Sequence, residues 1–195
     1  MTRVTSLSTV VVVGLIVTAA TLPLEGRAQA RRTDARLFIN EMTIAGLAEV
    51  QLGQMASERA ASPDVKAFGA MMVEDHSQAN AELSKVASQM KIEPAMEVDK
   101  KHTELASRLS ALSGAEFDRA YIDAMVEGHQ DVADGLRLWV MESRPLGAPP
   151  AGDPKAKDAA QGGPHEEALT AWSTKTLPTV EKHLRRARDL QKTLK

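Results

Sequence analysis

The sequence predicts an all-α protein, a four-helix bundle with a short extra helix in the crossover between helices 2 and 3. Only 3% of the residues are aromatic, β-branched residues are sparse beyond the first 20 positions, and helix-forming Ala, Leu, Met, Glu, Lys and Gln dominate. Four long segments repeat their apolar residues at alternating steps of three and four, which is the spacing of one helix face. Sandwiches and barrels have a different composition, so an all-β fold is excluded.

The charge balance and the cysteine count exclude several classes of function. The chain has 24 Lys and Arg against 26 Asp and Glu, a net charge of -2, so it lacks the basic excess of a nucleic-acid binder. We therefore expect no nucleic-acid partner. The absence of cysteine excludes disulfides, thiolate nucleophiles, Cys-ligated zinc and iron–sulfur clusters. A metal ion would have to use His, carboxylate or Met ligands.

The first 30 residues have the pattern of an export signal. Arg3 supplies a short positive region, Leu7 to Ala20 are apolar, and Ala28-Gln29-Ala30 has the small-x-small pattern that precedes a cleavage site. We predict a signal peptide over 1–30, a mature domain over 31–195, and a periplasmic or secreted location. Peripheral association with the outer membrane is one alternative, and an uncleaved N-terminal anchor is another. No later segment could span a bilayer, so we expect no transmembrane span in the mature chain.

The first two predicted helices flank a break at Ser62-Pro63. The first runs from about Asp34 to Arg59, and the second ends near Met90. Ser62 can cap the second helix, and proline fits the first helical turn. Their inward faces are apolar or small except for Glu49 in the first helix and His76 in the second. The faces comprise Phe38, Met42, Ala45, Glu49, Leu52 and Ala56, followed by Val65, Phe68, Met72, His76, Ala79, Leu83, Val86 and Met90.

Two further long helices also have apolar inward faces that are interrupted by a polar residue. The third begins after Ser113-Gly114, and the fourth runs from about His165 to Leu194. The polar residue in the third face is His129, and the fourth face contains His183 in addition to Thr176. The faces comprise Ile122, Met125, His129, Val132, Leu136 and Trp139, followed by Leu169, Trp172, Thr176, Val180, His183, Ala187, Leu190 and Leu194.

The connections between these helices differ in character. Glu97 to Leu112 reads as a short amphipathic helix in the crossover, which docks through three leucines, Leu105, Leu109 and Leu112. Residues 143–164 contain five prolines and four glycines and have no apolar period, so we predict a flexible surface loop there.

The four polar residues in otherwise apolar faces form the candidate metal site: Glu49, His76, His129 and His183. Glu49 lies 13 residues before Ser62 and His76 lies 14 residues after it. At 1.5 Å per residue, both are about 20 Å from that turn and should face each other. Similar counting places His129 near the middle of the bundle and His183 slightly beyond it. We predict that they converge and bind one divalent transition-metal ion, whose identity the sequence does not reveal.

Other interpretations of this site remain open. The four residues could form a hydrogen-bonded core network that fixes helix register without a metal, since a buried Glu needs partners. Some of them could also point outward if a face is displaced by one residue. Asp75, next to His76, is expected to face solvent or to cap a partner rather than to join the site. Met72 and Met125 stand one turn before His76 and His129, which would suit copper(I), although methionine at this spacing usually packs in a core.

The second and third long helices share a weak internal similarity. Lys66-Ala67-Phe68 precedes His76 as Arg119-Ala120-Tyr121 precedes His129, at an offset of 53 residues. Duplication of a helical hairpin would instead relate the first helix to the third. We therefore interpret the similarity as a common architecture around the site.

Several short runs resemble a known protein family. They are Ala48-Glu49-Val50-Gln51-Leu52-Gly53, Val65-Lys66-Ala67-Phe68-Gly69, Met72-Val73-Glu74-Asp75-His76, Phe117-Asp118-Arg119-Ala120-Tyr121, Met125-Val126-Glu127-Gly128-His129, and Thr176-Leu177-Pro178 followed by His183-Leu184. These runs are similar to those of domain of unknown function family 4142, a group of exported bacterial proteins often labelled as outer-membrane proteins. The resemblance extends over nearly all of Phe38 to Leu190. It implies a ferritin-like bundle of undefined biochemical role.

Ferritin-like di-iron enzymes use a Glu on each of two helices and a Glu-x-x-His motif on each of the others. Val73, Val126 and Val180 occupy the position of that Glu, three residues before the histidines, so di-iron oxidase or ferroxidase chemistry is disfavoured. The predicted function is an exported bundle protein that holds a transition metal through Glu and His. The alternative is a non-enzymatic, stress-related structural or interaction module of the cell envelope with a buried polar network and no metal. The sequence does not identify a protein partner.

Overall fold

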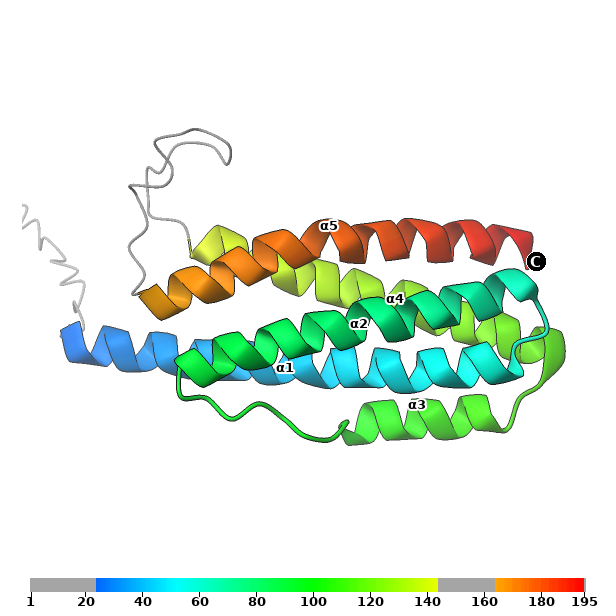
Figure 1. The fold of residues 1–195 in the computed structure, drawn as a ribbon, viewed down its shortest axis with the longest axis horizontal. Coiled ribbons are helices and arrows are strands. Elements are labelled where there is room, and N and C mark those ends of the chain that lie inside the picture. The colour runs from blue at the N-terminus through cyan, green and yellow to red at the C-terminus, as the bar shows by residue number, and fades with distance from the viewer. Residues whose placement is uncertain (1–23, 144–163, 195) are drawn as a thin grey trace, which may run out of the picture.

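The computed structural model describes residues 24–143 and 164–194, and this part of the chain is all-helical (Figure 1). The all-α prediction is therefore confirmed. The predicted loop falls almost entirely on residues 144–163, and most of the predicted signal peptide falls on residues 1–23, both outside the described residues. The elements are α1 (Leu24–Arg59), α2 (Pro63–Gln89), α3 (Lys100–Ser110), α4 (Gly114–Glu142) and α5 (Pro164–Thr193).

The four long helices lie side by side, with the short α3 along the outside (Figure 1). α2 returns antiparallel to α1, and α3 then carries the chain back along the molecule, so that α4 runs in the same direction as α2. α5 is antiparallel to α4. α1 packs on α2 and α4, and α5 packs on the same two helices. α2 and α4 are thus diagonal partners whose side chains can meet at the centre.

The N-terminus of α2 is held by a residue of α4. Ser62 takes the N-cap position and Pro63 the first helical turn, as predicted, but the Ser62 side chain makes no capping bond. Instead, the buried carboxylate of Asp118 accepts hydrogen bonds from the backbone N–H groups of Ala61 at 2.9 Å and Ser62 at 2.7 Å. The α1–α2 turn is therefore fixed to the start of α4.

α1 begins at Leu24, ahead of the start near Asp34 that apolar spacing predicted. The added segment, LEGRAQARRT, is rich in Leu, Glu, Arg, Ala and Gln, which have high helix propensity. It has no apolar period, and the prediction relied on that period. In this part of the chain, no helix is both long and apolar enough to cross a membrane.

The core consists of two apolar clusters with a polar layer between them. One cluster includes Leu52, Met72, Met125 and Ala187, and the other includes Met42, Leu83, Ala133 and Val180. Each long helix contributes to both clusters and carries one residue of the polar layer between its two contributions. The residues of this layer are Glu49, His76, His129 and His183, and α1 also buries Thr43 next to Met42.

Candidate metal centre

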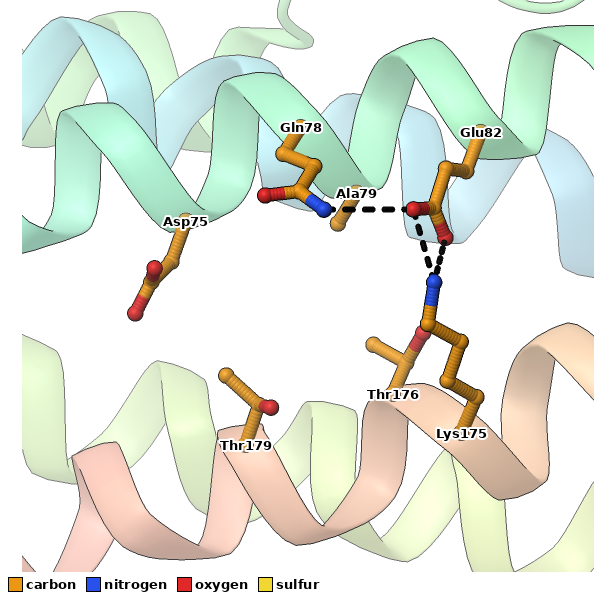
Figure 2. A pocket seen from close by; sticks show the side chains of 7 residues that line it. All are labelled: Asp75, Gln78, Ala79, Glu82, Lys175, Thr176 and Thr179. Atoms are coloured by element: carbon orange, nitrogen blue, oxygen red, sulfur yellow. Dashed lines mark hydrogen bonds and ion pairs between the residues drawn. The ribbon is translucent and has the colours of Figure 1, made fainter.

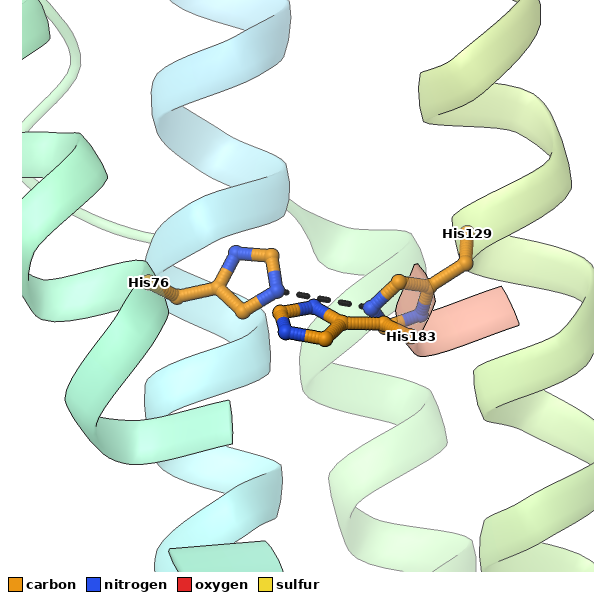
Figure 3. Close-up of side chains that lie close together, drawn as sticks. All are labelled: His76, His129 and His183. Carbon is orange, nitrogen blue, oxygen red and sulfur yellow. Dashed lines mark hydrogen bonds between the residues drawn. The ribbon is translucent and has the colours of Figure 1, made fainter. Parts of the chain in front are cut away.

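Three histidines from three helices meet in the polar layer (Figure 3). His76 comes from α2, His129 from α4 and His183 from α5, and they are 8%, 1% and 1% exposed. The ring centroids of each pair are 5.4 Å apart. One nitrogen from each ring lies within 4.8 Å of the other two. The structure thus brings together three of the four residues that the sequence singled out.

The closest approach in the cluster is between the Nε2 atoms of His76 and His129, at 3.4 Å. This separation exceeds the usual range of about 2.7–3.2 Å for a hydrogen bond donated by N–H. A tetrahedral ion with nitrogen ligands at about 2.0–2.1 Å places two of those nitrogens about 3.3–3.4 Å apart. The spacing of the two atoms therefore suits two ligands of one ion, and in the metal-free protein it allows a long hydrogen bond.

The outer nitrogens of two rings have partners that determine which inner nitrogen keeps a lone pair. His129 Nδ1 lies 2.8 Å from the Met125 carbonyl oxygen, which can only accept, so Nδ1 carries the hydrogen and Nε2 is free to ligate. His183 Nε2 lies 2.7 Å from the Asp75 carboxylate and donates to it. The other nitrogen of His183, Nδ1, is buried and has no hydrogen-bond partner. Both rings are therefore oriented as metal-binding histidines usually are.

The charge state of the cluster also suits a metal. Burial lowers the pKa of His76 well below its ordinary value of 6.5, and the neighbouring rings of His129 and His183 lower it further. Burial also lowers the pKa of His183, although the hydrogen bond to Asp75 opposes this shift. Because a protonated imidazole cannot bind a metal, depressed pKa values keep these two rings ready to do so at neutral pH.

Glu49 lies behind His129 rather than in the group of converging nitrogens. Its Oε1 is 3.5 Å from His129 Nδ1, on the side of the ring away from Nε2. Burial raises the pKa of Glu49, and His129 opposes this effect. Its Oε2 and the hydroxyl of the buried Tyr121 both lack hydrogen-bond partners. Glu49 was predicted as a ligand, and the structure instead places it where it can orient His129 and compensate charge.

Asp75 has a larger role than sequence reasoning assigned to it. Its side chain is 34% exposed, and it forms the hydrogen bond to buried His183 described above. Its position next to His76 was the one available signal, but the pairing with a residue of α5 depends on which helix packs beside α2.

Asp75 also lines a surface depression, which we call the α2–α5 groove (Figure 2). In the groove, Lys175 of α5 forms an ion pair with Glu82 of α2, with Nζ 2.7 Å from Oε1. The lining residues are Asp75, Gln78, Ala79, Glu82, Lys175, Thr176 and Thr179.

The internal similarity corresponds to facing positions of α2 and α4. His76 and His129 are 53 residues apart in the sequence and meet at the centre. Phe68 and Tyr121 have the same offset, and their rings contact edge to face with centroids 6.3 Å apart. Met72 and Met125 are buried within the apolar cluster that contains these aromatic rings.

Comparison with known proteins identifies the family. The family model described as "Domain of unknown function (DUF4142)" matches residues 20–143, and the chain belongs to this family. No curated protein and no solved structure matches the chain. The matched segment contains α1 to α4 with His76 and His129, while His183 in α5 lies beyond it. Because the family description carries no activity, a functional proposal has to come from the geometry.

Proposed function

We propose that this protein binds one divalent transition-metal ion between His76, His129 and His183. The observation that carries the proposal is the convergence of three buried imidazoles from three helices, with their nitrogens within 4.8 Å of one another. Imidazole ligands suit zinc, copper, nickel, cobalt and ferrous iron. Three nitrogens leave one position of a tetrahedral ion for water or another small ligand.

A buried polar network without a metal is the alternative. Buried polar atoms in folded proteins nearly always have hydrogen-bond partners, because an unsatisfied one costs about 1–3 kcal/mol. Here Nδ1 of His183 and Oε2 of Glu49 have none. An ion at the centre would satisfy the nitrogen, whereas the network alone leaves it unpaired. This difference favours the metal.

We further propose a ferritin-like fold and export from the cytoplasm. The crossover through α3, which makes α2 and α4 parallel, supports the fold. A crystal structure would test it.

The proposal of export rests on the sequence pattern before Arg31. Intact-mass spectrometry of the protein from its native host should show a chain that starts near Arg31, and a mature product that retains Met1 would contradict cleavage.

Metal-dependent stability tests the central proposal. Metal-stripped protein is melted at neutral pH with zinc, copper, iron, manganese, nickel or cobalt added one at a time. At least one ion should raise the melting temperature by mass action, and His129→Ala should abolish the rise. His102→Ala is the matched control, since His102 lies on α3 and contacts Asp99, outside the cluster. If all six ions leave the wild-type melting temperature unchanged, the proposal is wrong.

A further inference from the structure

The α2–α5 groove connects solvent with the buried cluster through a single residue. The Asp75 carboxylate lines the groove, and it accepts a hydrogen bond from His183 Nε2 at 2.7 Å. The ring of His183 is 1% exposed. In Figure 2, Asp75 and Thr179 point into the groove from opposite sides. Asp75 thus contacts both the surface and the inner ring.

The groove has the size and the charge that a cation requires. Its volume is about 100 Å³, which is room for several water molecules. Glu82 neutralises Lys175 in an ion pair, so the Asp75 carboxylate adds a further negative charge to the groove. A second depression on the described surface is lined by Arg119, Ile122, Asp123, Gln191 and Leu194. Among the described residues, none of these five has a hydrogen bond or ion pair with the three histidines.

We propose that the metal ion reaches the centre through the α2–α5 groove and that Asp75 is the positioning residue of this route. This inference rests on the proposed metal-binding function. Asp75 attracts the hydrated ion at the surface and, by accepting from Nε2–H, keeps the lone pair of His183 Nδ1 available. No proton has to leave His183 when the ion binds, because Nδ1 is already unprotonated in this tautomer. Of the three rings, His183 is the one that a residue of the groove holds by a hydrogen bond.

Obstruction of the groove tests the route without altering a ligand. The chain has no cysteine, so Thr179→Cys can be labelled specifically with a bulky maleimide. Ser107→Cys, on the exposed face of α3, is labelled in the same way as the control. Zinc transfer from a chromophoric chelator is followed by stopped flow, and equilibrium binding is measured on the same samples.

The labelled Thr179→Cys protein should take up zinc about tenfold more slowly or slower still, with unchanged affinity at equilibrium. Labelled Ser107→Cys should match the wild type, and so should Thr179→Cys capped with a small methylthio group, because the cap removes the free thiol that could itself bind zinc. Equal uptake rates in both labelled proteins would overturn the route.

A charge substitution tests the role of Asp75 itself. Asp75→Asn keeps an oxygen acceptor for His183 Nε2–H and removes the charge. We expect zinc association to slow several-fold and to lose part of its dependence on ionic strength. Glu74→Gln removes the same charge from the adjacent, exposed position of α2 and should have a smaller effect. Asp75→Glu should restore most of the rate.

The failures of the two proposals are distinguishable. If wild-type protein binds no ion at equilibrium, the metal proposal fails and the entry route fails with it. If it binds one ion that depends on His129, but neither the Thr179 label nor Asp75→Asn slows uptake relative to its control, only the entry route is wrong.

Discussion

Replacement of His76 by leucine should separate metal binding from folding. The His76 ring is 8% exposed and lies on α2 between the buried apolar residues Met72 and Leu83, so leucine suits the position. In metal-free protein the substitution removes the 3.4 Å contact and leaves His129 Nε2 without it, at a cost of about 1–3 kcal/mol. The buried leucine contributes about 1.5–3 kcal/mol in return. The free energy of unfolding should therefore change by less than about 2 kcal/mol.

The stabilisation by the bound metal ion should fall by a larger amount. With free ion at about 100 times Kd, the wild type gains about 2.7 kcal/mol. For a domain of this size, that gain raises the melting temperature by about 5–10 °C. If loss of one nitrogen ligand weakens affinity about 100-fold, the gain at the same ion concentration falls to about 0.4 kcal/mol, or about 1–2 °C.

The assay is thermal unfolding followed by circular dichroism, on chelator-stripped protein at neutral pH with and without zinc or the ion that stabilises the wild type best. His102→Leu controls for the loss of a histidine outside the cluster. A His76→Leu protein that keeps the full ion-dependent shift would refute the assignment of His76 as a ligand. An ion-independent loss of several kcal/mol in the metal-free variant would favour the structural network instead.

Three further predictions follow from buried groups. Urea unfolding of metal-free Glu49→Gln protein should show stability falling as pH drops below 6.5, because His76 and His183 have lowered pKa values and the unfolded chain takes up protons first. The Glu49→Gln background is used because Glu49 would contribute the opposite pH dependence: its pKa is raised in the folded protein, so it stabilises the fold at low pH, and this stabilisation is lost as the pH rises through that pKa. A stability that does not change with pH would contradict the prediction that His76 and His183 are buried in the neutral form. Tyr121→Phe should alter the free energy of unfolding by less than about 1 kcal/mol, since the hydroxyl has no partner, and a larger loss would reveal one. Asp118→Ala should lower the free energy of unfolding in denaturant by about 2–4 kcal/mol, because it removes the acceptor of two backbone N–H groups. Zinc affinity measured by calorimetry should stay unchanged. Undiminished stability would contradict the role of Asp118 in holding the start of α2.

Most of the helical architecture could be predicted from local sequence patterns. The proline at Pro63 and the Ser113-Gly114 break set the starts of α2 and α4 within a residue, and the three leucines of the crossover identified α3. Every face position assigned from the apolar spacing is buried or half-buried in the structure. The start of α1 was missed because its first turns have helix propensity without an apolar face.

The candidate site was predictable to the level of helix faces but not of individual contacts. Polar interruptions of apolar faces, together with counting from turns, placed His76 and His129 near the middle of the bundle and His183 slightly beyond it, and the structure brings the three together. Periodicity states which face of a helix turns inward, but it does not state which neighbour that face meets. Glu49 contacts His129 because α1 packs on α4, and Asp75 reaches His183 because α2 packs on α5. Both relations depend on the lateral order of the helices, which the sequence pattern leaves open.

X-ray absorption spectroscopy of the metal-loaded wild type tests the central claim most directly. The spectrum at the absorption edge of the bound ion reports the ligand atoms and their distances without any substitution. For zinc, we predict one ion per chain with three imidazole nitrogens at about 2.0–2.1 Å and one further light ligand. A bound ion surrounded by oxygen alone, with no imidazole scattering, would contradict a metal centre at His76, His129 and His183.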